Sequence, residues 1–128
     1  MNKLEEDDLQ RVMEVIRHAV EFAENNDSAF ATQILTAVVE EFPGLAIGHS
    51  YLGWILSRSG RHREAIEQGR VAVQLEPESE RVSLLFFRVL WSAGERDQAL
   101  NEMKRFTAIG HSDEYSKMME EWTQIEES

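Results

Sequence analysis

Histidines and carboxylates are the side chains of this sequence that could carry acid–base or metal chemistry. The four histidines fall in four different predicted elements: His18, His49, His62 and His111. No two of them have the spacing of one helical turn that would let them share a metal ion, so we expect structural histidines and no metal site. The absence of cysteine also removes disulfides, zinc–thiolate sites and thiol nucleophiles.

The paired carboxylates do not form an acid–base dyad. Glu5–Glu6, Glu40–Glu41 and Glu120–Glu121 are adjacent pairs on predicted helices, where both members meet solvent. A catalytic dyad instead needs one environment that moves two pKa values apart. The sequence also lacks a nucleophile elbow, a phosphate-binding loop and a glycine-rich dinucleotide turn. We therefore expect no catalytic residue, no cofactor and no enzymatic activity.

The net charge of −11 argues against binding of nucleic acid or of an anionic membrane. Acidic residues concentrate at both ends of the chain, whereas most arginines lie in the middle. The segment 1–8 is acidic and has no apolar core, so we expect no signal peptide there. Because no apolar run approaches the length of a membrane span, we expect a soluble, cytoplasmic protein.

Apolar residues recur at helical spacing along the whole chain, and no stretch alternates with period two for long enough to form a strand. Helices are predicted at about residues 7–25, 28–42, 45–58, 63–75, 79–92 and 96–108, with a last helix after Gly110. That last helix carries one apolar stripe, made of Tyr115, Met118, Met119, Trp122 and Ile125. These elements predict an all-α protein.

Several residues repeat with a period of 34. The repeating sets are Ala31, Ala65 and Ala99; Asn26, Gly60 and Gly94; and Pro43 and Pro77. Asparagine and glycine both tolerate a left-handed backbone, so each member of the second set can end the first helix of a repeat. Two further sets are predicted to hold core positions: Phe22, Leu56 and Leu90, and His18, Leu52 and Phe86.

This skeleton resembles the tetratricopeptide repeat (TPR), a helix–turn–helix unit of 34 residues. The resemblance implies a single domain over residues 1–128, an α-solenoid of three stacked helical hairpins with a C-terminal capping helix. The repeats would cover about 12–45, 46–79 and 80–111, and the capping helix 112–126. It also implies that the recurring alanines sit where two helices pass closely. The sequence departs from the family at His49, where tryptophan is usual, and at Gly69, where a large aromatic residue is usual.

One face of each first helix does not follow the period, because its chemistry changes from Val20 to Trp54 to Arg88. In proteins of this fold that face lines a concave groove in which peptides bind, so the resemblance assigns it a ligand surface. The residues that we expect there, together and partly exposed, are Tyr51, Trp54, Arg58, Arg81, Leu84, Arg88 and Trp91. Tryptophan and arginine are also the residues that dominate binding energy at protein interfaces.

The function that we expect is a non-catalytic protein–protein interaction module that binds a peptide or helix of a partner. One subfamily grips terminal carboxylates with lysines and asparagines, but this chain has Ile16, Val20 and Tyr51 at those places and retains only Arg81. An apolar segment with a few acidic residues would suit the surface better.

Other interpretations stay open. The tryptophans could fill gaps between unevenly stacked repeats, and the last helix could cross to a second copy in a homodimeric structural protein. A small secretion-type chaperone would have a similar size and charge. The sequence does not choose between a capping helix that covers its own chain and one that covers a second copy.

Overall fold

Seven helices follow one another along residues 5–127, the part of the chain that this computed structural model describes. They are α1 (Glu6–Glu24), α2 (Ser28–Glu41), α3 (Ala46–Arg58), α4 (His62–Leu75), α5 (Glu80–Ser92), α6 (Arg96–Thr107) and α7 (Asp113–Glu127). Within that range there is no strand, so the all-α prediction is confirmed. Outside the described residues lie residues 1–4 and residue 128. The first four belong to segment 1–8, in which we expect no signal peptide.

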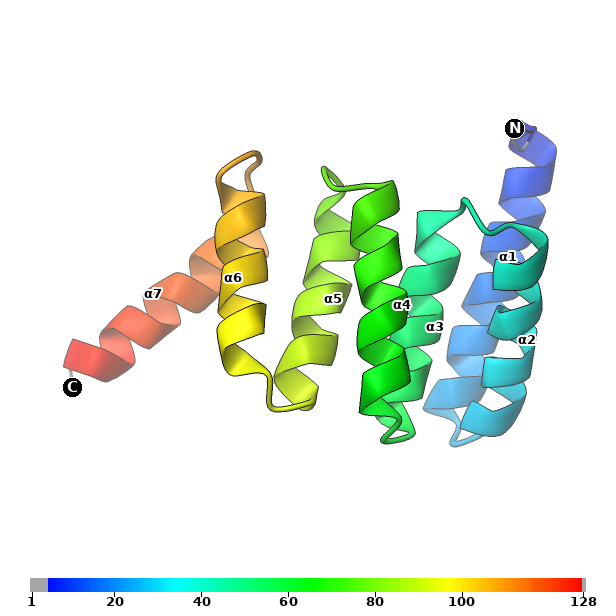
Figure 1. Ribbon diagram of the computed structural model, residues 1–128, viewed down its shortest axis with the longest axis horizontal. Coiled ribbons are helices and arrows are strands. Elements are labelled where there is room, and N and C mark those ends of the chain that lie inside the picture. Colours follow the sequence, from blue (N-terminus) through cyan, green and yellow to red (C-terminus); the bar gives the residue numbers. More distant parts are fainter. Residues whose placement is uncertain (1–4, 128) are drawn as a thin grey trace.

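The first six helices form three helical hairpins that stack side by side in chain order (Figure 1). Figure 1 shows two layers, with α2, α4 and α6 in front of α1, α3 and α5. Helix α7 lies on the side of the rear layer, and its far end points away from the array. The prediction of three stacked hairpins with an additional C-terminal helix is therefore confirmed. No helix in the described range is both long and apolar enough to cross a bilayer.

The first helix of every hairpin ends at a left-handed residue. The φ angles are +67° at Asn26, +78° at Gly60 and +82° at Gly94. At each site the amide of the next residue donates a hydrogen bond back to a carbonyl five residues earlier, for example Arg61 N to Leu56 O at 2.9 Å. This bond satisfies carbonyl groups that the helix leaves free. The predicted role of the three period-related turn residues is confirmed.

The recurring alanines sit where helices pass closely. Ala31, Ala65 and Ala99 each have 0% exposed surface. Next to Ala65, α3 comes so close to α4 that a Cβ atom on Gly53 would lie 3.0 Å from the Ala65 carbonyl oxygen. The hairpin α3–α4 therefore has room for no larger side chain at its crossing point.

We expect Ala65→Leu to destabilise the fold by about 1–3 kcal/mol, because Ala65 has no exposed surface and the added atoms must displace its neighbours in the core. Urea denaturation would measure the change. Ala37 on α2 is exposed, so Ala37→Leu is the matched control and should leave the unfolding free energy nearly unchanged. An Ala65→Leu protein that unfolds at the wild-type urea concentration would contradict the close packing.

Gly69 departs from the family pattern, and the structure supplies a physical reason. The ring of Phe86 on α5 lies over Gly69 of α4, and a Cβ atom at this position would overlap the ring. An aromatic side chain from the next hairpin thus fills the space that an aromatic residue at position 69 would occupy. Gly69 and Phe86 therefore pack as a pair, and the choice of residue at one position depends on the other.

Two predicted core residues of the first hairpin are exposed instead. His18 lies on the surface, and Phe22 is 39% exposed, with its ring packed edge-on against Phe30 at 4.8 Å. The equivalent positions in the next repeats, such as Leu52 and Leu56, are buried. Those residues pack against a preceding hairpin, and among the described residues no hairpin precedes the first.

His49 is buried, and both of its ring nitrogens are hydrogen bonded. Its Nε2 donates to the carbonyl oxygen of Pro43 at 2.8 Å, and its Nδ1 pairs with the side-chain amide of Gln68 at 2.8 Å. The ring thereby links the turn before α3 to helix α4. This is a structural role.

Candidate functional site

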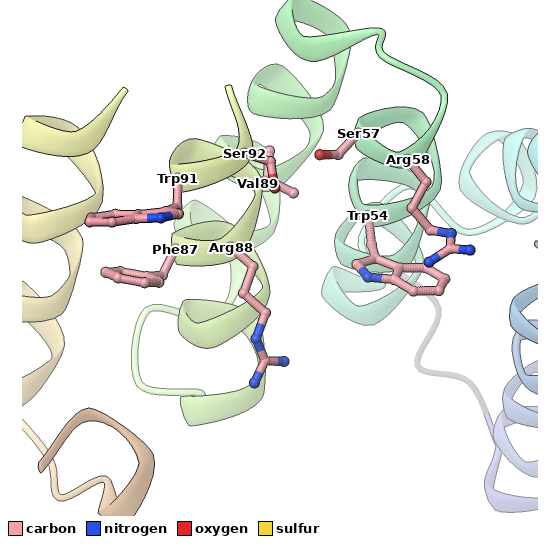
Figure 2. A pocket seen from close by; sticks show the side chains of 8 residues that line it. All are labelled: Trp54, Ser57, Arg58, Phe87, Arg88, Val89, Trp91 and Ser92. Carbon is pink, nitrogen blue, oxygen red and sulfur yellow. The ribbon is translucent and has the colours of Figure 1, made fainter. Parts of the chain in front are cut away.

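A depression of about 370 Å³ lies between α3 and α5. Its lining consists of Trp54, Ser57, Arg58, Phe87, Arg88, Val89, Trp91 and Ser92 (Figure 2). Four of the seven residues that the sequence assigns to a binding surface therefore come together here. They project from the same face of two neighbouring first helices, as their spacing predicts.

Aromatic side chains stand on both sides of this depression. In Figure 2, Trp54 lies on one side and the parallel rings of Phe87 and Trp91 lie on the other, with Arg88 between them. Trp91 is 37% exposed and Trp54 is half-buried. The Arg58 guanidinium lies 4.8 Å from the centre of the Trp54 ring, within the range of a cation–π contact.

A second depression, of about 380 Å³, lies along α1. Its lining consists of Gln10, Met13, Glu14, Ile16, Arg17, Val20, Tyr51 and Arg81. At its rim Arg81 Nη1 donates a hydrogen bond to Tyr51 Oη at 3.4 Å. The surface that the sequence predicts as one thus consists of two depressions, one on each side of α3.

Leu84 does not belong to this surface. It is only 6% exposed and packs in the core cluster with Phe87 and Leu90, so the prediction of partial exposure is wrong for this residue. All residues from 82 to 87 of α5 are buried, because neighbouring hairpin helices cover one side and the first turns of α7 cover the other. The 34-residue period alone could not predict that α7 also packs against α5.

The arginines of the surface differ in their partners. Arg88 Nη2 bonds Glu114 Oε2 of α7 at 2.7 Å, and Arg17 pairs with Glu21 at 3.1 Å. Arg58 and Arg81 make no ion pair with a carboxylate of the described residues. In a chain with 24 acidic and 13 basic residues, these two cations could readily have been neutralised. Their hydrogen-bond acceptors are neutral: Arg58 donates to the Ala23 carbonyl oxygen at 3.5 Å, and Arg81 donates to the Tyr51 hydroxyl at 3.4 Å.

Trp91 connects α5 to α7. Its ring stacks on Trp122 of α7 with centres 5.6 Å apart, and it also stacks on Phe87 of α5 at 5.7 Å. Arg96 lies 5.0 Å from the centre of the Trp91 ring. Trp91 is therefore partly a packing residue between uneven helices. Trp54 has only Arg58 as a ring partner within the described residues.

The sequence did not reveal a buried polar network that holds α7 beside this site. Ser83 Oγ donates to Glu102 Oε2 at 2.7 Å and lies 2.8 Å from the hydroxyl of Tyr115, which has no exposed surface. Arg105 donates to both Glu102 carboxylate oxygens, at 2.8 and 2.6 Å, and to the Pro77 carbonyl at 2.8 Å. The feature of the sequence that could have predicted this network is Arg105, which lies three residues after Glu102 on the same helix face.

Burial raises the pKa of Tyr115 to about 12, from an ordinary value of 10.0. Below about pH 10 the hydroxyl is neutral in both the folded and the unfolded chain, and its contribution to stability is complete. Between about pH 10 and pH 12 only the unfolded chain loses the proton, so the unfolding free energy should fall by roughly 2 kcal/mol.

Urea unfolding at about pH 9 and about pH 11 would measure about half of this fall, roughly 1 kcal/mol. Tyr115→Phe is the control, since a phenylalanine cannot ionise, and its unfolding free energy should fall less over the same interval. Equal falls in the two proteins would show that Tyr115 titrates normally.

The arrangement is suited to binding rather than to bond chemistry. Its two depressions offer aromatic faces, apolar side chains and guanidinium groups, which together complement an apolar segment that carries carboxylates. Within the described part of the chain, no group of three or more histidine and acidic side chains could hold a metal ion.

No protein-family model matches the sequence, and no curated protein matches it either. Solved structures do match. The first TPR of Spaghetti (RPAP3), bound to the HSP90 peptide SRMEEVD, superposes with a TM-score of 0.73 at 12% identity over 93% of this chain and 98% of that one. The Sgt2 TPR domain from Aspergillus fumigatus has a TM-score of 0.73 at 16% identity, over 91% and 80% of the two chains. A MamA variant has a TM-score of 0.64 at 22% identity, over 80% and 74%.

Proposed function

We propose that this chain, which has the TPR fold, is a non-catalytic protein–protein interaction module. Its ligand is a peptide or helix of a partner protein that lies along the exposed face of α1, α3 and α5, which we call the groove. One observation carries the proposal: half-exposed Trp54 lines one depression with Arg58, Arg81 lines the depression on the other side of α3, and neither arginine has a carboxylate partner in the described residues.

The energetics favour a ligand with mixed chemistry. An apolar side chain placed on Trp54 or Tyr51 removes apolar surface from water, at about 25 cal/mol per Å². A carboxylate beside Arg58 or Arg81 gains a charge-assisted hydrogen bond without breaking an existing ion pair. A ligand that is only apolar would contact the aromatic rings but would form no ion pair with Arg58 or Arg81. A ligand that is only acidic would be repelled by the net charge of −11 and would make no apolar contact to offset that repulsion.

The peptide in the Spaghetti structure, SRMEEVD, is likewise acidic and carries apolar residues. Arg81 apart, the residues of this chain do not suit a clamp for a terminal carboxylate, since Ile16, Val20 and Tyr51 face the second depression. We therefore propose recognition of acidic residues inside a segment. The module needs no cofactor, does not bind nucleic acid or membrane, and works in the cytoplasm.

A photo-crosslinking amino acid at Ser57 would test this proposal in the native host. Ser57 is half-exposed and lines the depression beside Trp54, whereas Gln74 is exposed on α4, in the other layer. The Ser57 probe should capture one defined protein that the Gln74 probe does not capture, and Trp54→Ala should abolish the capture. Identical products from both positions would refute groove binding.

Self-assembly is a second candidate function, favoured by the exposed apolar residues of α7. Met119 is 40% exposed and Ile125 is 71% exposed. A homodimer could bury them against a second copy. Sedimentation equilibrium would separate this candidate from the first, since a mass of one chain at all concentrations excludes it.

A further inference from the structure

The first hairpin, at one end of the array, has an apolar outer side (Figure 1). We call this side the outer edge, and it is formed by Val15, His18 and Phe22 on one stripe of α1 and by Phe30 and Ile34 on α2. Val15 is 41% exposed and Phe30 is 43% exposed, and the rings of Phe22 and Phe30 meet edge-on with centres 4.8 Å apart. Terminal units of a repeat array need a polar outer face to stay soluble. The first hairpin departs from that rule, and exposed apolar patches of this kind mark interaction surfaces.

The equivalent positions of the other two hairpins are polar. One and two periods after the apolar pair Val15 and Ile34, the same two positions hold side chains that are hydrogen bonded to each other across the hairpin. These pairs are His49 with Gln68, at 2.8 Å, and Ser83 with Glu102, at 2.7 Å. The first hairpin thus has apolar side chains where the other two have a polar link.

The polar pairs anchor each hairpin to the loop that joins it to the hairpin before. His49 bonds the carbonyl oxygen of Pro43, and Arg105, which is held by Glu102, donates to the carbonyl oxygen of Pro77, both at 2.8 Å. Valine and isoleucine offer no donor to such a carbonyl, and a buried carbonyl without a partner costs free energy. The outer edge is therefore suited to an apolar surface rather than to a further hairpin of the same kind.

Phe30 is specialised in the same direction. One and two periods later its position holds Glu64 and Gln98, which are both exposed. The preceding hairpin therefore does not cover this position where such a hairpin is present, and a missing neighbour does not explain a phenylalanine there. An apolar ring at a position that stacking leaves open indicates contact with another molecule.

We propose that the outer edge binds the outer edge of a second copy and forms a two-fold symmetric homodimer. In such an interface the same residues lie on both sides, so each apolar stripe meets a surface of its own kind. Charge supports this occupant. The stripe of α1 continues as Asp8 and Arg11, which pair with each other at 3.8 Å, so it brings no net charge to the contact. Two chains of net charge −11 repel each other, and a neutral apolar edge is where they can meet at least cost.

The size of the outer edge sets the expected strength. With 19 residues in α1 and 14 in α2, the two helices side by side present a face of roughly 20 Å by 25 Å, or about 500 Å² per copy. A dimer would bury about 1,000 Å² in total, which is at the lower limit of specific interfaces and typical of weak association. We therefore expect a dissociation constant in the micromolar range.

Sedimentation equilibrium of the intact protein at increasing concentration tests the proposal. The mass should rise toward that of two chains, and Phe30→Gln should raise the dissociation constant by about tenfold or more. Glutamine is the residue of the third hairpin at this position, Gln98, so the variant should fold. Met119→Gln on α7, a residue of similar exposure, is the matched control and should leave the dimer unchanged.

A photo-crosslinking amino acid at His18 gives a second readout on the purified protein. Its product should contain two chains joined within residues 5–41 of each. A mass of one chain at all concentrations would refute the proposal. So would a dimer that Met119→Gln weakens and Phe30→Gln does not, or crosslinks from His18 to residues 113–127 of the second chain, because both place α7 in the contact. The groove proposal stands or falls separately, since none of the outer-edge residues lines either depression.

Discussion

A chain that lacks residues 112–128 is expected to unfold with a free energy at least about 3–5 kcal/mol lower than the intact chain, and to aggregate. Tyr115 has no exposed surface, and its ring contacts Phe87 at 5.6 Å and Phe106 at 6.0 Å. Truncation uncovers both phenylalanines and the Ser83 hydroxyl together. Repeat arrays need a polar terminal element, and exposed apolar ends promote association.

Urea denaturation and light scattering would measure the two effects. A shorter truncation that removes only residues 123–128 is the control, because it keeps Tyr115 and Trp122 and removes Ile125, which is 71% exposed. The short truncation should fold as the intact chain does. If the long truncation is equally stable and monomeric, α7 is an appendage and its apolar stripe belongs to a partner.

The second large effect is expected on binding. Trp54→Ala should weaken the complex with the crosslinked partner by about 2 kcal/mol or more, roughly thirtyfold in the dissociation constant. The side chain is half-exposed and has no ring partner other than Arg58 in the described residues, so the unfolding free energy should change much less. Isothermal titration calorimetry and thermal denaturation of the same variant would separate the two quantities.

Trp91→Ala is the informative comparison, since it should affect stability more than Trp54→Ala does. The ring of Trp91 stacks on Trp122 and on Phe87, so truncation removes contacts that join α5 to α7. Equal destabilisation by the two changes would make Trp54 a packing residue as well.

The 34-residue period, through its resemblance to the tetratricopeptide repeat, predicted the fold. It located the turn residues Asn26, Gly60 and Gly94, all of which have positive φ, and alanines without exposed surface. Such positions are determined by the contact between the two helices of one hairpin, which recurs in each repeat. It also placed six of the seven predicted surface residues beside one or the other depression.

The period could not predict what differs at the ends of the array. Phe22 is exposed where Leu56 is buried, because among the described residues nothing packs before the first hairpin. Leu84 is buried in the core cluster of the last hairpin, which also contains Tyr115 of α7. Buried Glu102 escaped notice because its partner Ser83 lies on α5 and is recognised only once α5 and α6 are placed together. Residues that the 34-residue period relates therefore need not have equivalent neighbours.

The ring of Phe86 over Gly69 limits how this protein can be engineered. A designer who transplants the middle hairpin into another solenoid would carry Gly69 and leave Phe86 behind, and a hole would open on the face of α4. The portable segment is therefore longer than one repeat and must extend through position 86. Conversely, a library that randomises position 86 would return mainly large rings unless position 69 is varied with it.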